Sequence, residues 1–178
     1  MKVSDIMTPS PYCCAPTDSL QEVARGMRDY DCGAVPVVDN GNIIGIVTDR
    51  DLAIRAIAEG RSPDEKVESV CTPSPQCCRV DDDVRDVQRI MSERQVRRVP
   101  VVDAEGRCVG IVSQADLARG AASGDRISDR EIAIVVERVS EPSRGDQGAN
   151  SSSAASAVRS HLPFGSAGSG GAELDCRV

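Results

Sequence analysis

The stretch GIVTDRDL at residues 45–52 returns as GIVSQADL at residues 110–117. In each copy an apolar run ends on a hydroxyl residue, Thr48 or Ser113, and an aspartate follows three residues later. A strand that ends in this way and leads at once into a helix places a hydroxyl and a carboxylate at a helix N-terminus. There the first backbone N–H groups are free and the helix dipole favours a bound anion. The sequence therefore predicts two anion-binding helix starts of the same design.

The two stretches belong to a tandem duplication. A shift of 64 residues lays the TPSP sequence at 8–11 on the TPSP sequence at 72–75, and the adjacent cysteines at 13 and 14 on those at 77 and 78. One extra residue enters the second copy just after Asp103. Both copies carry a turn-forming sequence at that point, and a hairpin turn accommodates an insertion easily. The constant shift between the copies and the turn sequence at the insertion both indicate a duplicated unit.

Each unit has the predicted order β-α-β-β-α. Apolar residues recur with helical spacing in one segment of each copy, and two apolar runs separated by a turn follow it. The expected elements are a strand at 12–15, a helix at 19–30, a hairpin of 35–38 with 43–47 and a helix at 49–58, then a strand at 76–80, a helix that includes 84–91, a hairpin of 99–102 with 108–112 and a helix at 114–119.

The domain organisation follows from these elements. We expect a first repeat at 1–59, a polar linker at 60–66, a second repeat at 67–121, a C-terminal helix at 127–140 and a disordered tail rich in Ser, Gly and Ala at 141–178. A unit of this size without a disulfide or a metal is marginal alone. The two repeats are therefore expected to pack as one α/β (α+β) module with a pseudo-two-fold axis.

The composition narrows the possible functions. A formal net charge of -7 disfavours nucleic acid and anionic membranes as partners. The single histidine, His161, lies in the tail, so a mechanism that needs a buried histidine has no candidate. Neither a metal-ligand set nor a phosphate-binding glycine loop is apparent, and we expect no enzyme activity. The chain has no apolar run of the ~18 residues that a membrane helix needs, and it is predicted to be cytoplasmic.

Three segments carry a family resemblance: DIMTPSP at 5–11, GAVPVVDNGNIIGIVTDRDL at 33–52 and RRVPVVDAEGRCVGIVSQADL at 97–117. This doubled pattern resembles the cystathionine β-synthase (CBS) domain pair. The resemblance implies a regulatory module that binds an adenine nucleotide (AMP, ADP or ATP) or a related adenosyl compound in the cleft between its repeats. It also implies a homodimer shaped as a flat disc. The C-terminal helix is similar to that of small stand-alone bacterial CBS-pair proteins, some of which are linked to hypoxia and stress responses.

The resemblance assigns roles within each quoted stretch. The hydroxyls of Thr48 and Ser113 are expected to contact phosphate, and the carboxylates of Asp51 and Asp116 to accept the hydroxyls of a ribose. A second interpretation needs no ligand, because Ser/Thr-x-x-Asp at a helix start is also a capping box. The two roles are compatible, since a capping side chain can also face a ligand.

The resemblance also implies that each site takes contacts from both repeats. The Thr48 site would use Arg97 or Arg98 and the turn at Thr72, with Arg50 as a further cation for phosphate. The Ser113 site would use the turn at Thr8 and the backbone near residues 32–35, where no cation matches the arginine pair. The first site is therefore predicted to be the better one. The alternative for each arginine is a solvated surface charge.

The cysteines leave two interpretations open. The adjacent pairs at 13–14 and 77–78 fit core packing, because a buried thiol behaves as a small hydrophobe. Alternatively Cys14, Cys32 or Cys176 forms a redox switch under oxidative stress.

The sequence thus predicts a homodimeric regulatory module with no required cofactor, which signals energy or stress status to an unidentified protein partner. The competing hypothesis is a ligand-independent interaction module, or a cysteine redox sensor, of the same fold.

Overall fold

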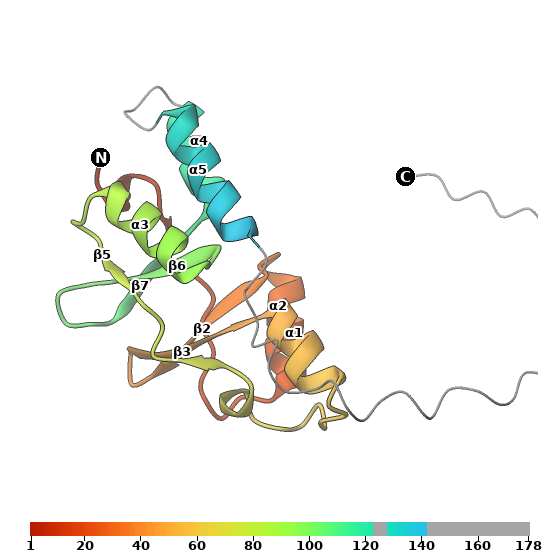
Figure 1. Ribbon diagram of the computed structural model, residues 1–178. Coiled ribbons are helices and arrows are strands. Elements are labelled where there is room, and N and C mark those ends of the chain that lie inside the picture. The colour runs from red at the N-terminus through yellow and green to blue at the C-terminus, as the bar shows by residue number, and fades with distance from the viewer. Residues whose placement is uncertain (123–127, 142–178) are drawn as a thin grey trace, which may run out of the picture. The chain divides into compact units, whose positions relative to one another are not determined.

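A computed structural model describes residues 1–122 and 128–141 (Figure 1). It confirms the α/β class and the two tandem repeats of the same element order. The expected disordered tail lies, apart from Glu141, outside the described residues. No helix within the described ranges is long and apolar enough to cross a membrane.

The first repeat has its predicted helices and hairpin. Its elements are α1 (Leu20–Asp29), β2 (Ala34–Asp39), β3 (Asn42–Thr48), α2 (Asp49–Asp51) and a continuing π-helical segment (Leu52–Ile57). The predicted helix at 49–58 is therefore present, but its second part is wider than an α-helix. Ala58 N–H donates to the Ala53 carbonyl at 3.0 Å, an i to i+5 bond.

The second repeat and the C-terminal helix are also confirmed. They comprise β5 (Cys78–Arg79), α3 (Val84–Arg94), β6 (Arg98–Val102), β7 (Cys108–Ser113), α4 (Gln114–Ala122) and α5 (Asp129–Ser140). Only one bridge, between Cys14 and Val37, stands where a strand at 12–15 was predicted. Pro11 and Pro16 flank that segment and lack the N–H groups that a longer ladder would need.

The opening segments of the two repeats are exchanged. The segment β1 (Thr8–Pro9) pairs with β7 of the second repeat, and β4 (Thr72–Pro73) pairs with β3 of the first. The resulting sheets have the strand orders β1-β7-β6-β5 and β2-β3-β4. The short 3-10 helices that precede these strands, Val3–Asp5 and Val67–Ser69, also pack on the opposite repeat. Val3 is buried in the core of the second repeat, and Val67 and Val70 are buried in the core of the first.

The glycine of each quoted stretch admits the exchanged segment. A Cβ at Gly45 would lie 2.9 Å from Cys71 Sγ and 3.2 Å from the Thr72 carbonyl oxygen. At Gly110 it would lie 2.6 Å from Met7 Sδ and 3.3 Å from the Thr8 carbonyl oxygen. Close approach of two backbones thus explains why both motifs begin with glycine.

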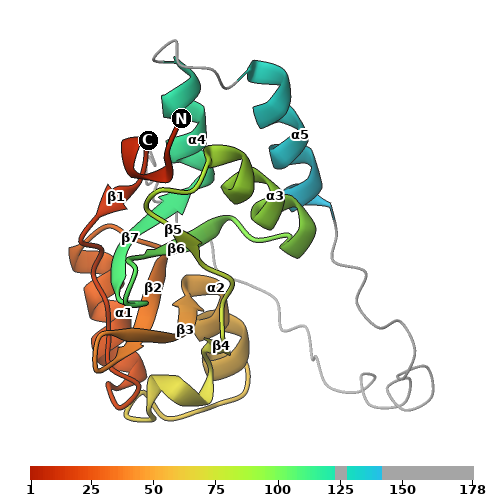
Figure 2. The ribbon, with the colours of Figure 1, turned by 90° about the vertical axis from the view of Figure 1, so that its left-hand side faces the viewer.

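The C-terminal helix completes the core of the second repeat. Figure 2 shows α5 beside α3, and it also contacts α4. Val135 and Val139 face this core, whereas Ile134 and Val136 on the other side are each 45% exposed. Ser128 caps the helix, with its hydroxyl accepting from Glu131 N–H. The structure thus places this helix on the module itself.

Val67→Ala tests the exchange. We expect a loss of about 1.5–3 kcal/mol in the free energy of unfolding, because two fully buried methyl groups leave a cavity in the first repeat. Val136→Ala makes the same deletion on the exposed side of α5 and should change stability by less than about 0.5 kcal/mol. Urea unfolding followed by circular dichroism measures both. Equal effects would contradict the burial of Val67 in the first repeat.

Candidate functional site

The helix start of the first repeat is closed by a reciprocal capping box. Thr48 Oγ1 accepts from Asp51 N–H at 3.1 Å. In return, Asp51 Oδ2 accepts from the Thr48 backbone N–H at 2.9 Å and from its hydroxyl at 2.7 Å. These residues are coupled because the strand β3 ends at Thr48, whose extended backbone directs its side chain over the first helical turn. The capping interpretation is confirmed at this site.

The second repeat repeats the arrangement. Asp116 Oδ2 accepts from the Ser113 N–H at 2.7 Å and from its hydroxyl at 2.6 Å, and Ser113 Oγ accepts from Asp116 N–H at 3.2 Å. One oxygen of each aspartate is therefore fully used by the cap. A ligand would have to use the other carboxylate oxygen.

The second oxygen of Asp51 contacts an arginine, Arg55, that was not among the residues predicted from the sequence. Arg55 Nε lies 3.5 Å from Asp51 Oδ1, and Arg55 Nη1 donates to Thr72 Oγ1 at 3.2 Å and to the Val70 carbonyl at 2.9 Å. Arg55 thus joins Asp51 to the exchanged segment of the other repeat. Its spacing of four residues from Asp51 on a predicted helix was the available signal.

The aspartate of the second repeat is more enclosed. Asp116 Oδ1 pairs with Arg119 on the next helical turn, and the Asp116 side chain is 6% exposed against 16% for Asp51. Gly120 stands where the duplication would place a counterpart of Arg55. The two sites therefore share the cap and differ in the groups around it.

Arg98 reaches across to the helix start of the first repeat. A Cβ at Gly33 would lie 3.4 Å from Arg98 Nη2 and 2.9 Å from Asp49 Oδ2. The Gly33 carbonyl also accepts from Asp49 N–H at 3.2 Å. The guanidinium of Arg98 is thus near the first residue of α2, within the part of the chain that holds Thr48 and Asp51. Ala34 occupies the corresponding position of the first repeat, so the second site has no equivalent residue.

The remaining candidates lie on the surface. Arg97 and Arg50 are exposed, and the Arg97 carbonyl accepts from Gln114 N–H at 3.1 Å. Thr72 pairs with Ile46 on the strand that ends at Thr48. Thr8 pairs with Ile111, on the strand that ends at Ser113. The structure therefore brings Thr72 to the first site and Thr8 to the second, while contact of any of them with a ligand stays a prediction.

The helix start of the first repeat is not an open anion site. Arg50 N–H donates to Asp49 Oδ1 at 2.7 Å, and Asp49 N–H is bonded to Gly33. With Asp51 N–H held by Thr48, these N–H groups are occupied within the protein. The expectation of free N–H groups at this helix is wrong, because the Gly33 carbonyl, the Asp49 carboxylate and the Thr48 hydroxyl each accept from one of them. A phosphate near this site would depend on arginine side chains instead.

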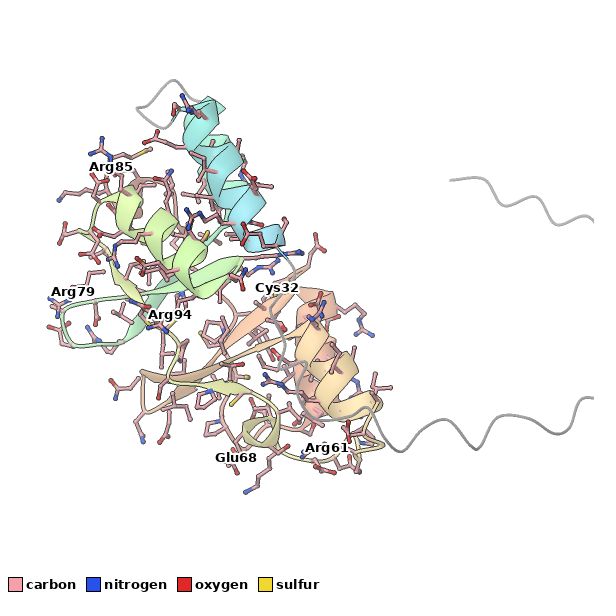
Figure 3. All side chains as sticks on the ribbon, in the orientation of Figure 1. Cys32, Arg61, Glu68, Arg79, Arg85 and Arg94 are labelled. Carbon is pink, nitrogen blue, oxygen red and sulfur yellow. The ribbon has the colours of Figure 1, made fainter. Side chains whose placement is uncertain are left out.

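The buried cysteines pack as core residues. Burial raises the pKa of the Cys14 and Cys78 thiols to about 12, and their Sγ atoms donate to the carbonyls of Pro36 and Pro100. This enclosure counts against Cys14 as a redox residue. Cys32, labelled in Figure 3, precedes β2 and is half-buried, and burial raises its pKa. Cys176 lies outside the described residues.

Metal ligands do not converge in the described ranges. No group of three or more His, Cys, Asp or Glu side chains among those residues is placed to hold a metal ion.

Comparison with known proteins decides the family. The model of the CBS domain matches residues 3–57 and, a second time, residues 67–123. The chain belongs to the CBS-domain family. Its duplicated motifs are those of a CBS pair, and CBS pairs as a class are regulatory.

Two bacterial relatives have similar sequences. The CBS domain-containing protein YhcV of Bacillus subtilis is 36% identical over 116 residues, which cover 65% of this chain and 82% of that protein. Hypoxic response protein 1 of Mycobacterium tuberculosis is 36% identical over 117 residues, which cover 65% of this chain and 81% of that protein.

Two solved CBS structures contain adenosyl ligands. CBSX2 of Arabidopsis thaliana in complex with AMP has a TM-score of 0.62 at 28% identity, covering 70% of this chain and 98% of that chain. The CBS pair of protein MJ0100, in complex with 5′-methylthioadenosine and S-adenosyl-L-methionine, has a TM-score of 0.62 at 30% identity, with the same coverage of 70% and 98%.

The buried thiols predict an alkaline loss of stability. Cys14 and Cys78 titrate near pH 9.0 in the unfolded chain, but their folded pKa is about 12. Above pH 9.0 the unfolded state holds fewer protons, so the free energy of unfolding falls with rising pH, by at most about 1.4 kcal/mol per pH unit for each thiol. Below pH 9.0 these thiols are protonated in both the folded and the unfolded state, so their full contribution to stability is present.

Urea unfolding at about pH 8 and about pH 10 measures this slope. The double variant Cys14→Ala/Cys78→Ala should show a shallower slope, whatever its stability at the lower pH. Cys71→Ala, which removes a less enclosed thiol, is the matched control. A slope that is the same in wild type and double variant would show that these thiols do not carry the effect.

Proposed function

We propose that this CBS pair is a non-enzymatic regulatory module that binds an adenine nucleotide or adenosyl compound near Asp51 and signals energy or stress status to a partner protein. The observation that carries the proposal is the convergence of both repeats on one helix start. Thr48 and Asp51 come from the first repeat, Arg98 from the second, and Thr72 from the exchanged segment. The adenosyl ligands of CBSX2 and MJ0100 support this class of ligand.

Each residue has a proposed role in binding. Asp51 Oδ1 accepts the hydroxyls of the ribose, because Oδ2 is held by the cap. Arg55 lies 3.5 Å from that same oxygen and must share it with the ribose or turn aside. Arg98 pairs with a phosphate as a charge-assisted hydrogen-bond donor.

The charges near Arg98 set a limit on the phosphate. The Asp49 carboxylate and the Arg98 guanidinium both lie next to Gly33. The negative charge of Asp49 repels a polyphosphate bound to Arg98. We therefore propose that AMP, or an adenosyl compound without phosphate, binds more tightly than ATP at this site. The second site, with Asp116 enclosed and paired with Arg119, is proposed to be the weaker one.

Binding would be read out through the geometry of the pair. A ligand held by both repeats favours one arrangement over others by its difference in affinity. We propose that α5, which leaves Ile134 and Val136 exposed, presents that change to a partner. A homodimer is part of the same proposal. Native mass spectrometry of freshly purified protein reports the number of subunits and any retained nucleotide together.

Asp51→Ala tests the site. We expect the affinity for AMP, measured by isothermal titration calorimetry, to fall by about tenfold or more, since a carboxylate that accepts ribose hydroxyls is removed. Glu131→Ala is the matched control, because Glu131 closes the same kind of capping box on α5, away from the site. It should lose the cap and keep the affinity. The nucleotide proposal is overturned if the wild-type protein shows no heat of binding with AMP, ATP or 5′-methylthioadenosine at millimolar concentration.

Arg98→Ala tests the assignment of the phosphate. The affinity for AMP should fall by about tenfold, while that for 5′-methylthioadenosine, which has no phosphate, should stay the same. Arg97→Ala removes the exposed neighbour and should change both affinities by less than about twofold. An equal loss for the two ligands in Arg98→Ala would place this side chain elsewhere than on the phosphate.

A further inference from the structure

Two thiols from different repeats lie against each other. Cys13 Sγ lies 3.8 Å from Cys108 Sγ, within hydrogen-bonding distance for sulfur, although the two residues are 95 positions apart in the sequence. Cys13 belongs to the segment that leads from β1 into the first repeat, and Cys108 is the first residue of β7 in the second. Both side chains are half-buried. The pair therefore lies where the chain passes between the repeats, apart from the proposed nucleotide site.

The duplication does not account for this contact. Cys77 is the counterpart of Cys13, and each of these thiols donates to the carbonyl of the proline two residues before it, at 3.4 Å. The counterpart of Cys108 is Ile43, which carries no sulfur. Cys77 also acts on Cys108, since its charge contributes to raising the pKa of that thiol. Between these two counterparts, it is Cys13 whose sulfur lies within hydrogen-bonding distance of Cys108.

The surroundings make the two sulfurs chemically different. The hydrogen bond with Cys108 lowers the pKa of Cys13, and the same bond together with burial raises the pKa of Cys108. Cys13 is therefore the sulfur that reaches the thiolate form first, and the thiolate is the nucleophile in cysteine oxidation. Cys14, the next residue, is buried, and its raised pKa keeps it protonated. Of the two adjacent cysteines, Cys13 is therefore the one expected to react.

We propose that Cys13 and Cys108 form a reversible disulfide that joins the two repeats when the protein meets a hydroperoxide. The Cys13 thiolate attacks the O–O bond of hydrogen peroxide, giving a sulfenic acid, and the departing hydroxide takes a proton to become water. Cys108 then loses its proton and its thiolate attacks the Cys13 sulfur, and the S–OH bond breaks as hydroxide leaves and takes up that proton to become a second water. Two thiols are oxidised and one peroxide is reduced.

The contact geometry permits this step with small movements. The sulfurs must approach from 3.8 Å to the ~2.05 Å of a disulfide, which rotation of two half-buried side chains can supply. The backbones are already tied nearby, because Cys108 N–H donates to the Gly41 carbonyl at 3.2 Å and Asn42 bridges to Arg107. The disulfide would fasten the segment that leads from β1 into the first repeat to the start of β7 in the second repeat.

The consequence is a covalent limit on movement between the repeats. A bridge that spans 95 residues restricts the unfolded chain strongly, so the oxidised protein should unfold at a temperature higher by roughly 10 °C. This inference does not depend on the nucleotide proposal, since it uses other residues and other chemistry.

Peptide mapping of the full chain tests the bridge. Reduced protein is treated with hydrogen peroxide, trapped with N-ethylmaleimide, and the monomer band of a non-reducing gel is digested with trypsin. The expected product joins the peptide of residues 3–25 to that of residues 108–119, and dithiothreitol separates them. Cys13→Ser should abolish this product, and Cys14→Ser, which alters the other cysteine of the same peptide, should retain it.

Cys77→Ser provides a second control, because it replaces the duplicated counterpart and leaves the pair intact. It should retain the linked peptides and the rise in unfolding temperature, whereas Cys13→Ser should show neither. The proposal is overturned if peroxide yields no linked peptides in wild type. It is equally overturned if the link persists in Cys13→Ser, or if it appears only in covalent dimers of the chain.

Discussion

The exchange of opening segments is the constraint on which the rest of the structure depends. Neither repeat closes its sheet with its own first strand: β1 pairs with β7 and β4 pairs with β3. The same two strands, β3 and β7, end on the hydroxyl residues that cap α2 and α4. The position of each candidate site is therefore set by pairing across the duplication. A change in how the repeats pack must reach the sites, because the strands that hold the repeats together also carry the capping hydroxyls.

The capping boxes then decide what a ligand can use. Each aspartate gives one oxygen to the backbone and hydroxyl of its own cap, and an unsatisfied helix N–H in that place would be costly. The motif is stable without a ligand, so its presence alone does not imply binding. What distinguishes the first site is its surroundings: Arg98 arrives from the other repeat, and Arg55 connects Asp51 to Thr72. The proposed preference for the first site thus depends on tertiary contacts more than on the motif.

The sequence predicted what local periodicity and self-similarity encode. The helices, both hairpins and the duplication were confirmed because apolar spacing and a constant shift report them directly. Periodicity did not predict the strand pairing of the exchange, since strands of two residues such as Thr72–Pro73 carry no periodic signal. Only the family resemblance placed the Thr72 turn at the first site and the Thr8 turn at the second. A π-helical segment of six residues, Leu52–Ile57, is too short to differ in pattern from an α-helix. The contact between Cys13 and Cys108 follows from the exchange and could not be predicted without it.

The departures from symmetry are where the two halves acquire separate roles. Duplication gives both halves the same strands, capping residues and glycines. At some equivalent positions the two halves carry pairs of chemically different residues. These pairs are Asp49 and Gln114, Arg55 and Gly120, Ala34 and Arg98, and Ile43 and Cys108. The first three alter the charge around a helix start, and the last adds a sulfur at the junction of the repeats. Because the framework is satisfied in both halves, these few positions can vary without loss of the fold, and they are where function is expected to have diverged.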